Sequence, residues 1–427
     1  MSQSTLAYRS LAPSGSSPAS VSDSGPQPLL PEDRLLLLTA GGPANDAAIR
    51  SAAEGPIDWA RLLGLARVER AVPVVYPRLR DVAGALIPSD VLEQLRRLAL
   101  VSDFAMLHLE ARLRESLRVL EHAGVRVMLL KGAALAYSAY GGVRQRPMSD
   151  IDILVDSGNA MSARRAMLNA GWRTIQGGMP EAVYEHHHHL PPVHDARSPE
   201  LQLEIHTALF PERHPFAFET SDLWATSRSL GPPLSNAVVP APAHLLLHAC
   251  IHFFWSHQAR FGVWRTIRDL DAISRAGTVD WGAFVATARS ARALTSCYWT
   301  FRIAELAAGV TAPKEVMETL RPARRAYLRR AIERHLLLNL FPVRSVCPSA
   351  RIEHVLWEMA AMPRWSGHGD VRPWDDEPNF VIPDAPARDV RTARRTSPVL
   401  SALAVPKYML SLMRSQRATA RRPRGQS

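Results

Sequence analysis

Cysteines and long apolar runs are scarce in this chain, and each shortage excludes a class of protein. The 427 residues contain only three cysteines, Cys250, Cys297 and Cys347, which are far apart and form no CxxC pair. Neither a disulfide framework nor a cysteine-ligated zinc site is therefore indicated, and the reducing cytoplasm is the expected location. The apolar run at residues 35–38 is much shorter than the roughly 20 residues that span a bilayer. We therefore expect no transmembrane segment.

Two common nucleotide-binding signatures are also missing. Neither GxxxxGKS/T nor GxGxxG occurs in the sequence. The first is typical of P-loop proteins and the second of dinucleotide-binding folds, because their glycines let backbone amides approach phosphates closely. We therefore expect neither of these folds.

Positive charge is plentiful, but it is concentrated at one end of the chain. The formal net charge is +11, and residues 388–427 contain nine arginines and Lys407 against a single acid, Asp389. The rest of the chain is thus close to neutral. A basic tail can contact nucleic acid or an anionic surface, or it can simply be solvated, so we expect at most a weak contact of this kind.

Composition and periodicity divide the chain into five parts and predict an α+β fold. An apolar stripe with spacings of three and four predicts a long helix from a Ser89 cap to Gly124. Before it, Pro73 is expected to end a helix that starts near Ile57 and leaves Arg70 available to solvent. The parts are a disordered segment rich in Ser and Pro (1–29), an N-terminal helical part (30–124), a catalytic core with a small mixed sheet (125–239), a helical C-terminal part (240–345), and an irregular segment with a basic tail (346–427).

Residues 125–155 contain the arrangement that is hardest to explain by folding alone. The apolar run at 125–130 predicts a short buried strand that stops at Lys131-Gly132, and good helix formers follow at 133–140. Glycine permits close approach of the backbone to a ligand, and the first amides of a helix favour phosphate. Lys131 adds a cation there, so this turn is a candidate phosphate site, with the basic Arg144 and Arg146 nearby.

An acidic strand is predicted at residues 149–155. Because strand side chains alternate, Asp150 and Asp152 project together, while Ile151, Ile153 and Val155 enter a core. Two adjacent like charges are unfavourable unless a cation lies between them, and a divalent metal would supply one. The alternative is a pair of solvated acids on an exposed strand end.

A second strand, residues 201–206, carries a third acid. Leu201, Leu203 and Ile205 alternate with polar residues that include Glu204 and His206. If this strand lies beside the first, Glu204 becomes a third oxygen ligand, and three carboxylates near a phosphate-binding turn indicate metal-assisted phosphoryl or nucleotidyl transfer. His206 either orients Glu204 or contacts the substrate, or it is a polar residue facing solvent.

These segments together resemble a known family. LLKG, RPMSDIDILV, HHLPP and LEIHTAL are similar to the uncharacterised nucleotidyltransferases of the polymerase-beta-like superfamily, and the resemblance runs from about Ile57 to helices near residue 340. It implies a small mixed sheet flanked by helices, with Asp150, Asp152 and Glu204 holding two Mg²⁺ ions and the Lys131-Gly132 turn holding the triphosphate. Where the broader superfamily usually has Gly-Ser or Gly-Gly at this turn, the present chain has Lys-Gly.

The reaction that the resemblance implies is transfer of a nucleoside monophosphate. A nucleoside triphosphate such as ATP would donate it to an unidentified acceptor, and pyrophosphate would leave. Lys131, Gly132, Arg144 and Arg146 are the candidate contacts of the triphosphate. Two alternatives are a module that binds nucleotide and metal without turnover and a phosphotransferase that moves the terminal phosphate.

Histidines and two arginines are further candidates. The four histidines at residues 186–189 are expected to point alternately to opposite faces of an extended chain, which places one or two imidazoles near the phosphates rather than four around one metal ion. His244, His248 and His252 recur every four residues on a predicted helix, where a packing role is favoured over metal binding. On the next helix, Arg265 and Arg268 share a face, and they either clamp an anionic substrate or are solvated.

Overall fold

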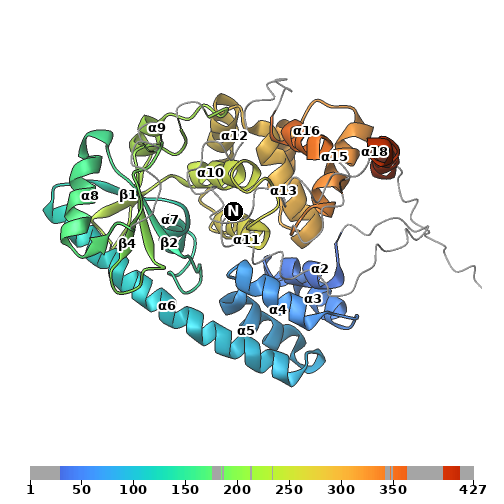
Figure 1. The fold of residues 1–427 in the computed structure, drawn as a ribbon, viewed down its shortest axis with the longest axis horizontal. Helices are drawn as coiled ribbons and strands as arrows, with labels where there is room; N and C mark the ends of the chain where they lie inside the picture. Colours follow the sequence, from blue (N-terminus) through green and yellow to red (C-terminus); the bar gives the residue numbers. More distant parts are fainter. Residues whose placement is uncertain are drawn as a thin grey trace, which may run out of the picture.

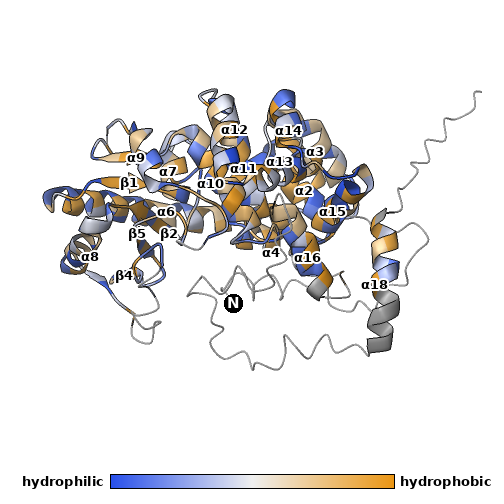
Figure 2. Cartoon of the chain, turned by 90° about the horizontal axis from the view of Figure 1, so that it is seen from above, coloured by the Kyte–Doolittle hydropathy of each residue, from blue (hydrophilic) through white to orange (hydrophobic). Residues whose placement is uncertain are grey.

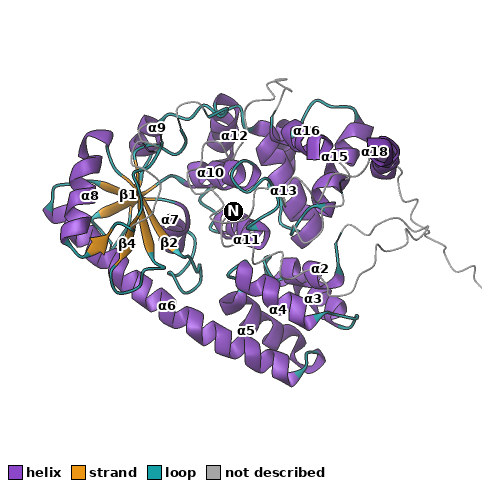
Figure 3. Ribbon diagram, in the orientation of Figure 1, coloured by secondary structure: helices purple, strands orange, loops and turns teal. Residues whose placement is uncertain are grey.

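The computed structural model describes residues 29–175, 184, 187–211, 214–232, 234–341, 347, 350–362 and 398–413. Residues 1–28 of the segment predicted to be disordered, His186, and most of the basic tail lie outside these ranges. Helices surround one mixed sheet that lies at one end of the molecule (Figures 1 and 3). The predicted α+β fold is therefore confirmed.

The N-terminal helical part is a cluster of short helices. They are α2 (Pro31–Leu38), η1 (Pro43–Asn45), α3 (Asp46–Ala53), α4 (Trp59–Val68), α5 (Val72–Ala83) and η2 (Gly84–Leu86). Pro73 lies in the first turn of α5, where its missing N–H removes no helical hydrogen bond. The expectation that Pro73 ends the preceding helix is corrected, because α4 already ends at Val68 and a new helix begins at Val72.

The predicted long helix is α6 (Ser89–His122), which connects the N-terminal helices to the sheet (Figure 1). Its 34 residues correspond to about 51 Å, at about 1.5 Å per residue. Leu95, Leu113 and Leu120 of the apolar stripe are fully buried. Ser89 is not the cap that the sequence predicts, because Pro88 occupies that position and no side chain caps the helix.

The sheet has seven strands in the order β3-β4-β5-β2-β1-β7-β6. The strands are β1 (Val127–Leu129), β2 (Asp150–Leu154), β3 (Trp172–Arg173), β4 (Val193–Asp195), β5 (Gln202–His206), β6 (Arg228–Ser229) and β7 (Ala237–Val239). Strand β2 is parallel to β5 and antiparallel to β1. The helices and the 3-10 turn between the strands are α7 (Lys131–Ser138), η3 (Ser157–Asn159), α8 (Ala160–Asn169) and α9 (Thr220–Ala225).

The remaining helices form the C-terminal part. They are α10 (Pro242–Phe254), α11 (Val263–Arg275), α12 (Trp281–Ser290), α13 (Leu294–Ala308), α14 (Lys314–Leu320), α15 (Ala326–Leu338), α16 (Ala350–Ala361) and α18 (Pro398–Met413). Helix α16 is a difference from the irregular segment expected over 346–427, whereas α18 is the C-terminal helix packed on the body that the apolar stretch from Val399 to Met413 predicts. Both pack on the body: Trp357 Nε1 donates to the Phe254 carbonyl (2.8 Å), and Arg334 Nη1 donates to the Ser411 carbonyl (2.8 Å).

One main core runs through the N-terminal helices, the sheet and the C-terminal helices. Ile151, Ile153 and Val155 belong to it, as the alternation predicts, whereas Leu154 belongs to a smaller apolar cluster that includes Leu130 on the other face of the sheet. Helices carry both hydrophobic and hydrophilic residues, as amphipathic helices do (Figure 2). Among the described residues, no helix combines the length and the apolar character that crossing a membrane requires.

Candidate active site

The two acidic strands are direct neighbours in the sheet. Strands β2 and β5 pair in parallel with Asp152 opposite Glu204 and Asp150 opposite Gln202. Side chains at alternate positions share a face, so Asp150, Asp152 and Glu204 lie on one side of the sheet. This is the side opposite the main core. The strand that carries Glu204 therefore lies beside the strand that carries Asp150 and Asp152, as the prediction of a shared acidic site requires.

Lys131 lies between two of the three acids. Its Nζ is 2.8 Å from Asp152 Oδ1 and 3.7 Å from Glu204 Oε2. The residue begins α7 with a φ of +45°. A positive φ outside glycine is uncommon and costs on the order of 1–3 kcal/mol, and such strain is often found at functional sites. The turn that the sequence singles out is therefore strained, and its lysine is held against the acids.

His206 completes the cluster. Its Nε2 donates to Asp152 Oδ1 (3.0 Å) and lies 3.4 Å from Glu204 Oε2. The side chain is 1% exposed, which rules out the solvent-facing alternative for this residue. Asp152, Glu204 and His206 each place one ligand atom within 4.8 Å of the others, and Asp150 is not part of this group. The imidazole of His206 therefore orients the carboxylates of Asp152 and Glu204.

Burial and charge determine the ionisation of the cluster. Burial alone would raise the pKa of Asp152 and of Glu204, but the Lys131 ammonium and the His206 hydrogen bonds hold both pKa values below normal. Burial, followed by the charges of Asp152 and Glu204, raises the pKa of Asp150. For Lys131, burial would lower the pKa, but the three carboxylates raise it above its usual value. Against the effect of burial, hydrogen bonds to Asp152 and Glu204 also raise the pKa of His206, so Lys131 and His206 together stabilise the ionised forms of these two carboxylates.

The acidic strands and the Lys131 turn fall within a family match. The family model described as uncharacterised nucleotidyltransferase matches residues 55–309, which is more than half of the chain. The chain belongs to this family. No curated protein and no solved structure matches the chain. The resemblance inferred from LLKG and RPMSDIDILV is confirmed, and the match also covers the helices from α4 to α13.

In this member of the nucleotidyltransferase family, Gly132 has a packing role at the start of α7. A Cβ added there would lie 3.2 Å from Met148 Cβ, closer than side chains normally pack. Glycine therefore lets the Lys131 turn approach the loop that leads into β2.

Arg146 connects the loop before β2 to helix α11 of the C-terminal part. Its Nε and Nη2 donate to the two oxygens of Asp269 on α11 (2.6 and 2.8 Å), and its Nη1 donates to the Pro147 carbonyl (2.9 Å). Tyr140 Oη also donates to Asp269 Oδ1 (2.8 Å). The guanidinium predicted to contact phosphate is therefore engaged by Asp269. Arg144 differs, because its side chain is 60% exposed and pairs with Asp103 of α6 (2.5 Å).

Replacement of Asp269 by alanine is expected to lower the free energy of unfolding by about 3–5 kcal/mol, because the buried Arg146 guanidinium loses its bidentate partner. Urea denaturation measures this loss. Asp103→Ala removes the exposed pair with Arg144 and is the matched control, with an unchanged midpoint expected. Equal midpoints for the two variants would contradict the structural role of the Arg146–Asp269 pair.

The histidines at 187–189 do not alternate as the sequence predicts. The ring centroids of the immediate neighbours His187 and His188 are 4.3 Å apart, and each of the three residues places one ligand atom within 4.8 Å of the others. The chain bends at His187 and His188 and makes only an isolated bridge, from His189 to His206, so the alternation of a regular strand does not apply. These imidazoles therefore border the acidic cluster.

The helical histidines of α10 line a cleft beside Lys131. His248 and His252 face it together with His188 and the aromatic Trp255. Burial lowers the pKa of His248 to about 3 and lowers that of His252 well below normal, so both rings are neutral at pH 7. Among the described residues, His244, His248 and His252 do not form a group with ligand atoms close enough to share a metal ion. The cleft is therefore uncharged apart from Lys131.

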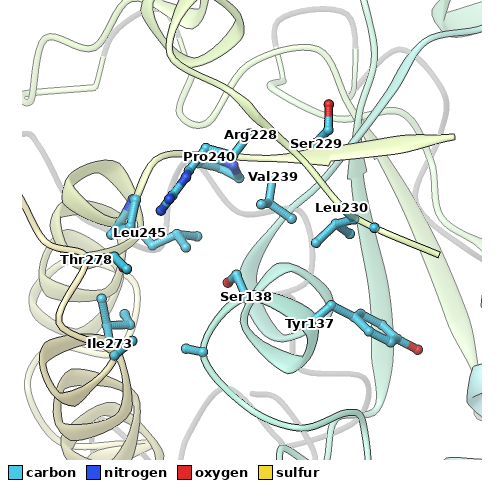
Figure 4. Close-up of a pocket in the computed structure, with 14 residues that line it drawn as sticks. Tyr137, Ser138, Arg228, Ser229, Leu230, Val239, Pro240, Leu245, Ile273 and Thr278 are labelled. Atoms are coloured by element: carbon cyan, nitrogen blue, oxygen red, sulfur yellow. The ribbon is translucent and has the colours of Figure 1, made fainter. Parts of the chain in front are cut away.

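A larger cavity lies at the other end of α7. Its volume is about 400 Å³, and Figure 4 shows Tyr137 and Ser138 of α7 on one side with Leu245 of α10 and Ile273 of α11 on the other. Edge strand β6 contributes Arg228 and Ser229. None of the acids of β2 or β5 lines this cavity, so it is separate from the cluster around Lys131.

The turn between α4 and α5 contacts the start of α11 near the acidic cluster, and the sequence does not predict this contact. Glu69 is fully buried, and its Oε2 accepts hydrogen bonds from the backbone amides of Trp264 (3.1 Å) and Arg265 (3.5 Å) at the start of α11. Arg70, expected to face solvent, is partly buried beside it. No local sequence signal indicates this contact, because its partners are about 195 positions apart.

Proposed function

We propose that this chain is a metal-dependent nucleotidyltransferase that moves a nucleoside monophosphate from a triphosphate such as ATP to an acceptor hydroxyl. The acceptor oxygen forms a bond to the α-phosphorus, the bond from that phosphorus to the bridging oxygen breaks, and pyrophosphate leaves. The observation that carries the proposal is the pairing of Asp152 with Glu204 on parallel strands, with Lys131 between them, in a chain of this family.

Asp150, Asp152 and Glu204 are the proposed ligands of two Mg²⁺ ions. Carboxylate oxygens are ligands that Mg²⁺ prefers. Lys131 Nζ, 2.8 Å from Asp152 and 3.7 Å from Glu204, already lies where a cation is favoured, and the pKa values of both carboxylates are held below normal. The residues present therefore fit divalent cations. When bound, such ions would neutralise phosphate charge and orient the reacting oxygens.

The neighbouring side chains have distinct proposed tasks. Lys131, whose pKa is raised by the carboxylates, remains protonated at neutral pH and binds phosphate rather than acting as a base. The amide of Gly132 at the start of α7 favours the same anion. His206 orients Asp152 and Glu204 through Nε2. Arg146 positions the loop before β2 against α11, and the exposed Arg144 can turn from Asp103 toward the triphosphate.

The proposed location and partners follow from the composition of the chain. The three cysteines are buried thiols that form no disulfide, which is typical of a reducing compartment such as the cytoplasm. The acceptor is unidentified. For the basic tail, which lies largely outside the described residues, the proposal is at most a weak contact with nucleic acid or an anionic surface.

Product analysis tests the proposed reaction. The purified chain is incubated with Mg²⁺, a metabolite extract and each nucleoside triphosphate labelled in the α-phosphate, and both the protein and the extract are analysed by mass for an added nucleotide. We expect transfer of the α-label with release of pyrophosphate. Release of nucleoside diphosphate would instead indicate a phosphotransferase, and tight calorimetric binding without any release would indicate a non-catalytic module. Either result would overturn the proposal.

A further inference from the structure

A pair of arginines from two distant parts of the chain meets at the edge of the acidic site. Arg70 lies in the turn between α4 and α5 and has a φ of +56°. The adjacent Glu69 accepts hydrogen bonds from the first amides of α11, including that of Arg265. Because a carboxylate at a helix N-terminus satisfies otherwise unpaired amides, this contact fixes the turn on α11. Arg70 and Arg265 are therefore held close together.

The guanidinium groups of Arg70 and Arg265 are not held in place by an acidic or carbonyl partner among the described residues. Among the described residues, neither Arg70 nor Arg265 makes a side-chain hydrogen bond or ion pair, although both are partly buried. Each guanidinium carries five N–H donors, and donors removed from water without an acceptor are unfavourable. By contrast, Arg146 in the same region is bound by Asp269. The arrangement leaves the donors of Arg70 and Arg265 available for a ligand.

The ion pair of Arg146 with Asp269 joins the loop that leads into β2 to α11, and with it to the Arg70 turn that Glu69 fixes on α11. Burial, followed by the charge of Arg265, lowers the pKa of Arg70, and the charge of Asp150 opposes this shift. Arg268, one turn along α11, adds a third cation: its Cζ is 5.8 Å from the Tyr140 ring centroid, and its buried Nε has no hydrogen-bond partner among the described residues. Arg70, Arg265 and Arg268 therefore lie near the end of β2 that carries Asp150.

We propose that Arg70 and Arg265 form the subsite for the terminal phosphates of the nucleoside triphosphate. This inference rests on the proposed function, because it assigns the anion that the site takes. Two guanidinium forks in the same region suit an anion with several oxygens on neighbouring phosphorus atoms, since each fork binds two oxygens. A polyphosphate chain held there would continue from the Lys131 and Asp150 region toward α11. The N-terminal and C-terminal helical parts would then both contact the substrate.

Binding of inorganic tripolyphosphate to the intact chain tests the subsite without requiring turnover. Isothermal titration is performed on the wild type, Arg70→Ala, Arg265→Ala and the double variant. We expect each single variant to raise Kd by about 10- to 100-fold, the effect of losing hydrogen bonds to a charged group. Arg67→Ala is the matched control, because Arg67 is exposed on α4 three positions before Arg70, and its Kd should equal that of the wild type.

The outcomes separate this inference from the reaction itself. If the wild type does not bind tripolyphosphate, or if the Arg70 and Arg265 variants bind it as the wild type does, the subsite is wrong even where α-label transfer is observed. If the arginine variants lose tripolyphosphate but no triphosphate yields pyrophosphate, the subsite stands and the proposed reaction fails. Arg70→Lys, which keeps the charge and the fold, should recover only part of the affinity, since lysine lacks the fork.

Discussion

Asp152→Asn is expected to lower kcat/KM for nucleotide transfer by about 10³-fold, which corresponds to roughly 4 kcal/mol of transition-state stabilisation. Asp152 makes the shorter contacts with Lys131 (2.8 Å) and His206 (3.0 Å), and its lowered pKa keeps it ionised. Asparagine has nearly the same shape but removes the charge that holds Lys131 and would hold a metal ion. Steady-state rates of pyrophosphate release measure the effect.

Asp156→Asn is the control for this variant. Asp156 lies two residues after the end of β2 and is exposed, so its replacement changes the charge of the same region without touching the cluster. Its kcat/KM should match that of the wild type. Circular dichroism and thermal unfolding establish that both variants are folded. Full activity of folded Asp152→Asn would show that the acidic cluster has no part in the reaction.

Lys131→Met is expected to lower the free energy of unfolding by about 3 kcal/mol in the presence of a chelator, because it leaves Asp152 and Glu204 buried without a compensating cation. Added Mg²⁺ should restore much of this loss, since ligand binding to the folded state stabilises it. The wild type, in which Lys131 already neutralises part of the charge, should respond less to Mg²⁺. Urea denaturation with and without Mg²⁺ measures both effects.

Lys314→Met is the matched control for Lys131→Met. Lys314 is also the first residue of a helix, α14, but it is exposed and has no carboxylate partner among the described residues. Its replacement should leave both the urea midpoint and its response to Mg²⁺ unchanged. If Lys131→Met is as stable as the wild type in chelator and gains nothing from Mg²⁺, Lys131 does not offset the charge of the two carboxylates.

Local patterns were sufficient to predict the elements that carry the acidic cluster. Alternation assigned Ile151 and Ile153 to the core, and it assigned Asp150 and Asp152 to the other face. The spacing of leucines predicted α6, and the motifs from LLKG to LEIHTAL predicted the family. These predictions hold because each depends on residues that are close in sequence.

Contacts between distant segments could not be predicted in this way. Arg146 looks like a free cation in the sequence because its partner Asp269 lies 123 positions away. Arg70 looks like a solvent-facing residue because helical periodicity assumes that α4 continues, whereas the chain turns at a positive φ to bring Glu69 to α11. The histidines at 187–189 depart from alternation because they bend beside β5 instead of forming a regular strand.

The order of the strands in the sheet explains why the position of Glu204 beside the other two acids could not be predicted from the sequence. Strand β5 lies beside β2 although two other strands, β3 and β4, come between them in the sequence. From the sequence, Glu204 could be predicted to join Asp150 and Asp152 only on the condition that the two strands are adjacent. Their parallel register, with Asp152 opposite Glu204, then places the two carboxylates together.

Binding of Mn²⁺ tests most directly whether the acids of β2 and β5 share metal ions. Electron paramagnetic resonance counts the ions bound in the presence of an α,β-methylene nucleoside triphosphate, which cannot release pyrophosphate. We expect the wild type and Glu200→Gln, an exposed control just before β5, to bind two ions, and we expect Glu204→Gln and Asp152→Asn to lose at least one. Unchanged binding in Glu204→Gln and Asp152→Asn would show that these acids do not share metal ions.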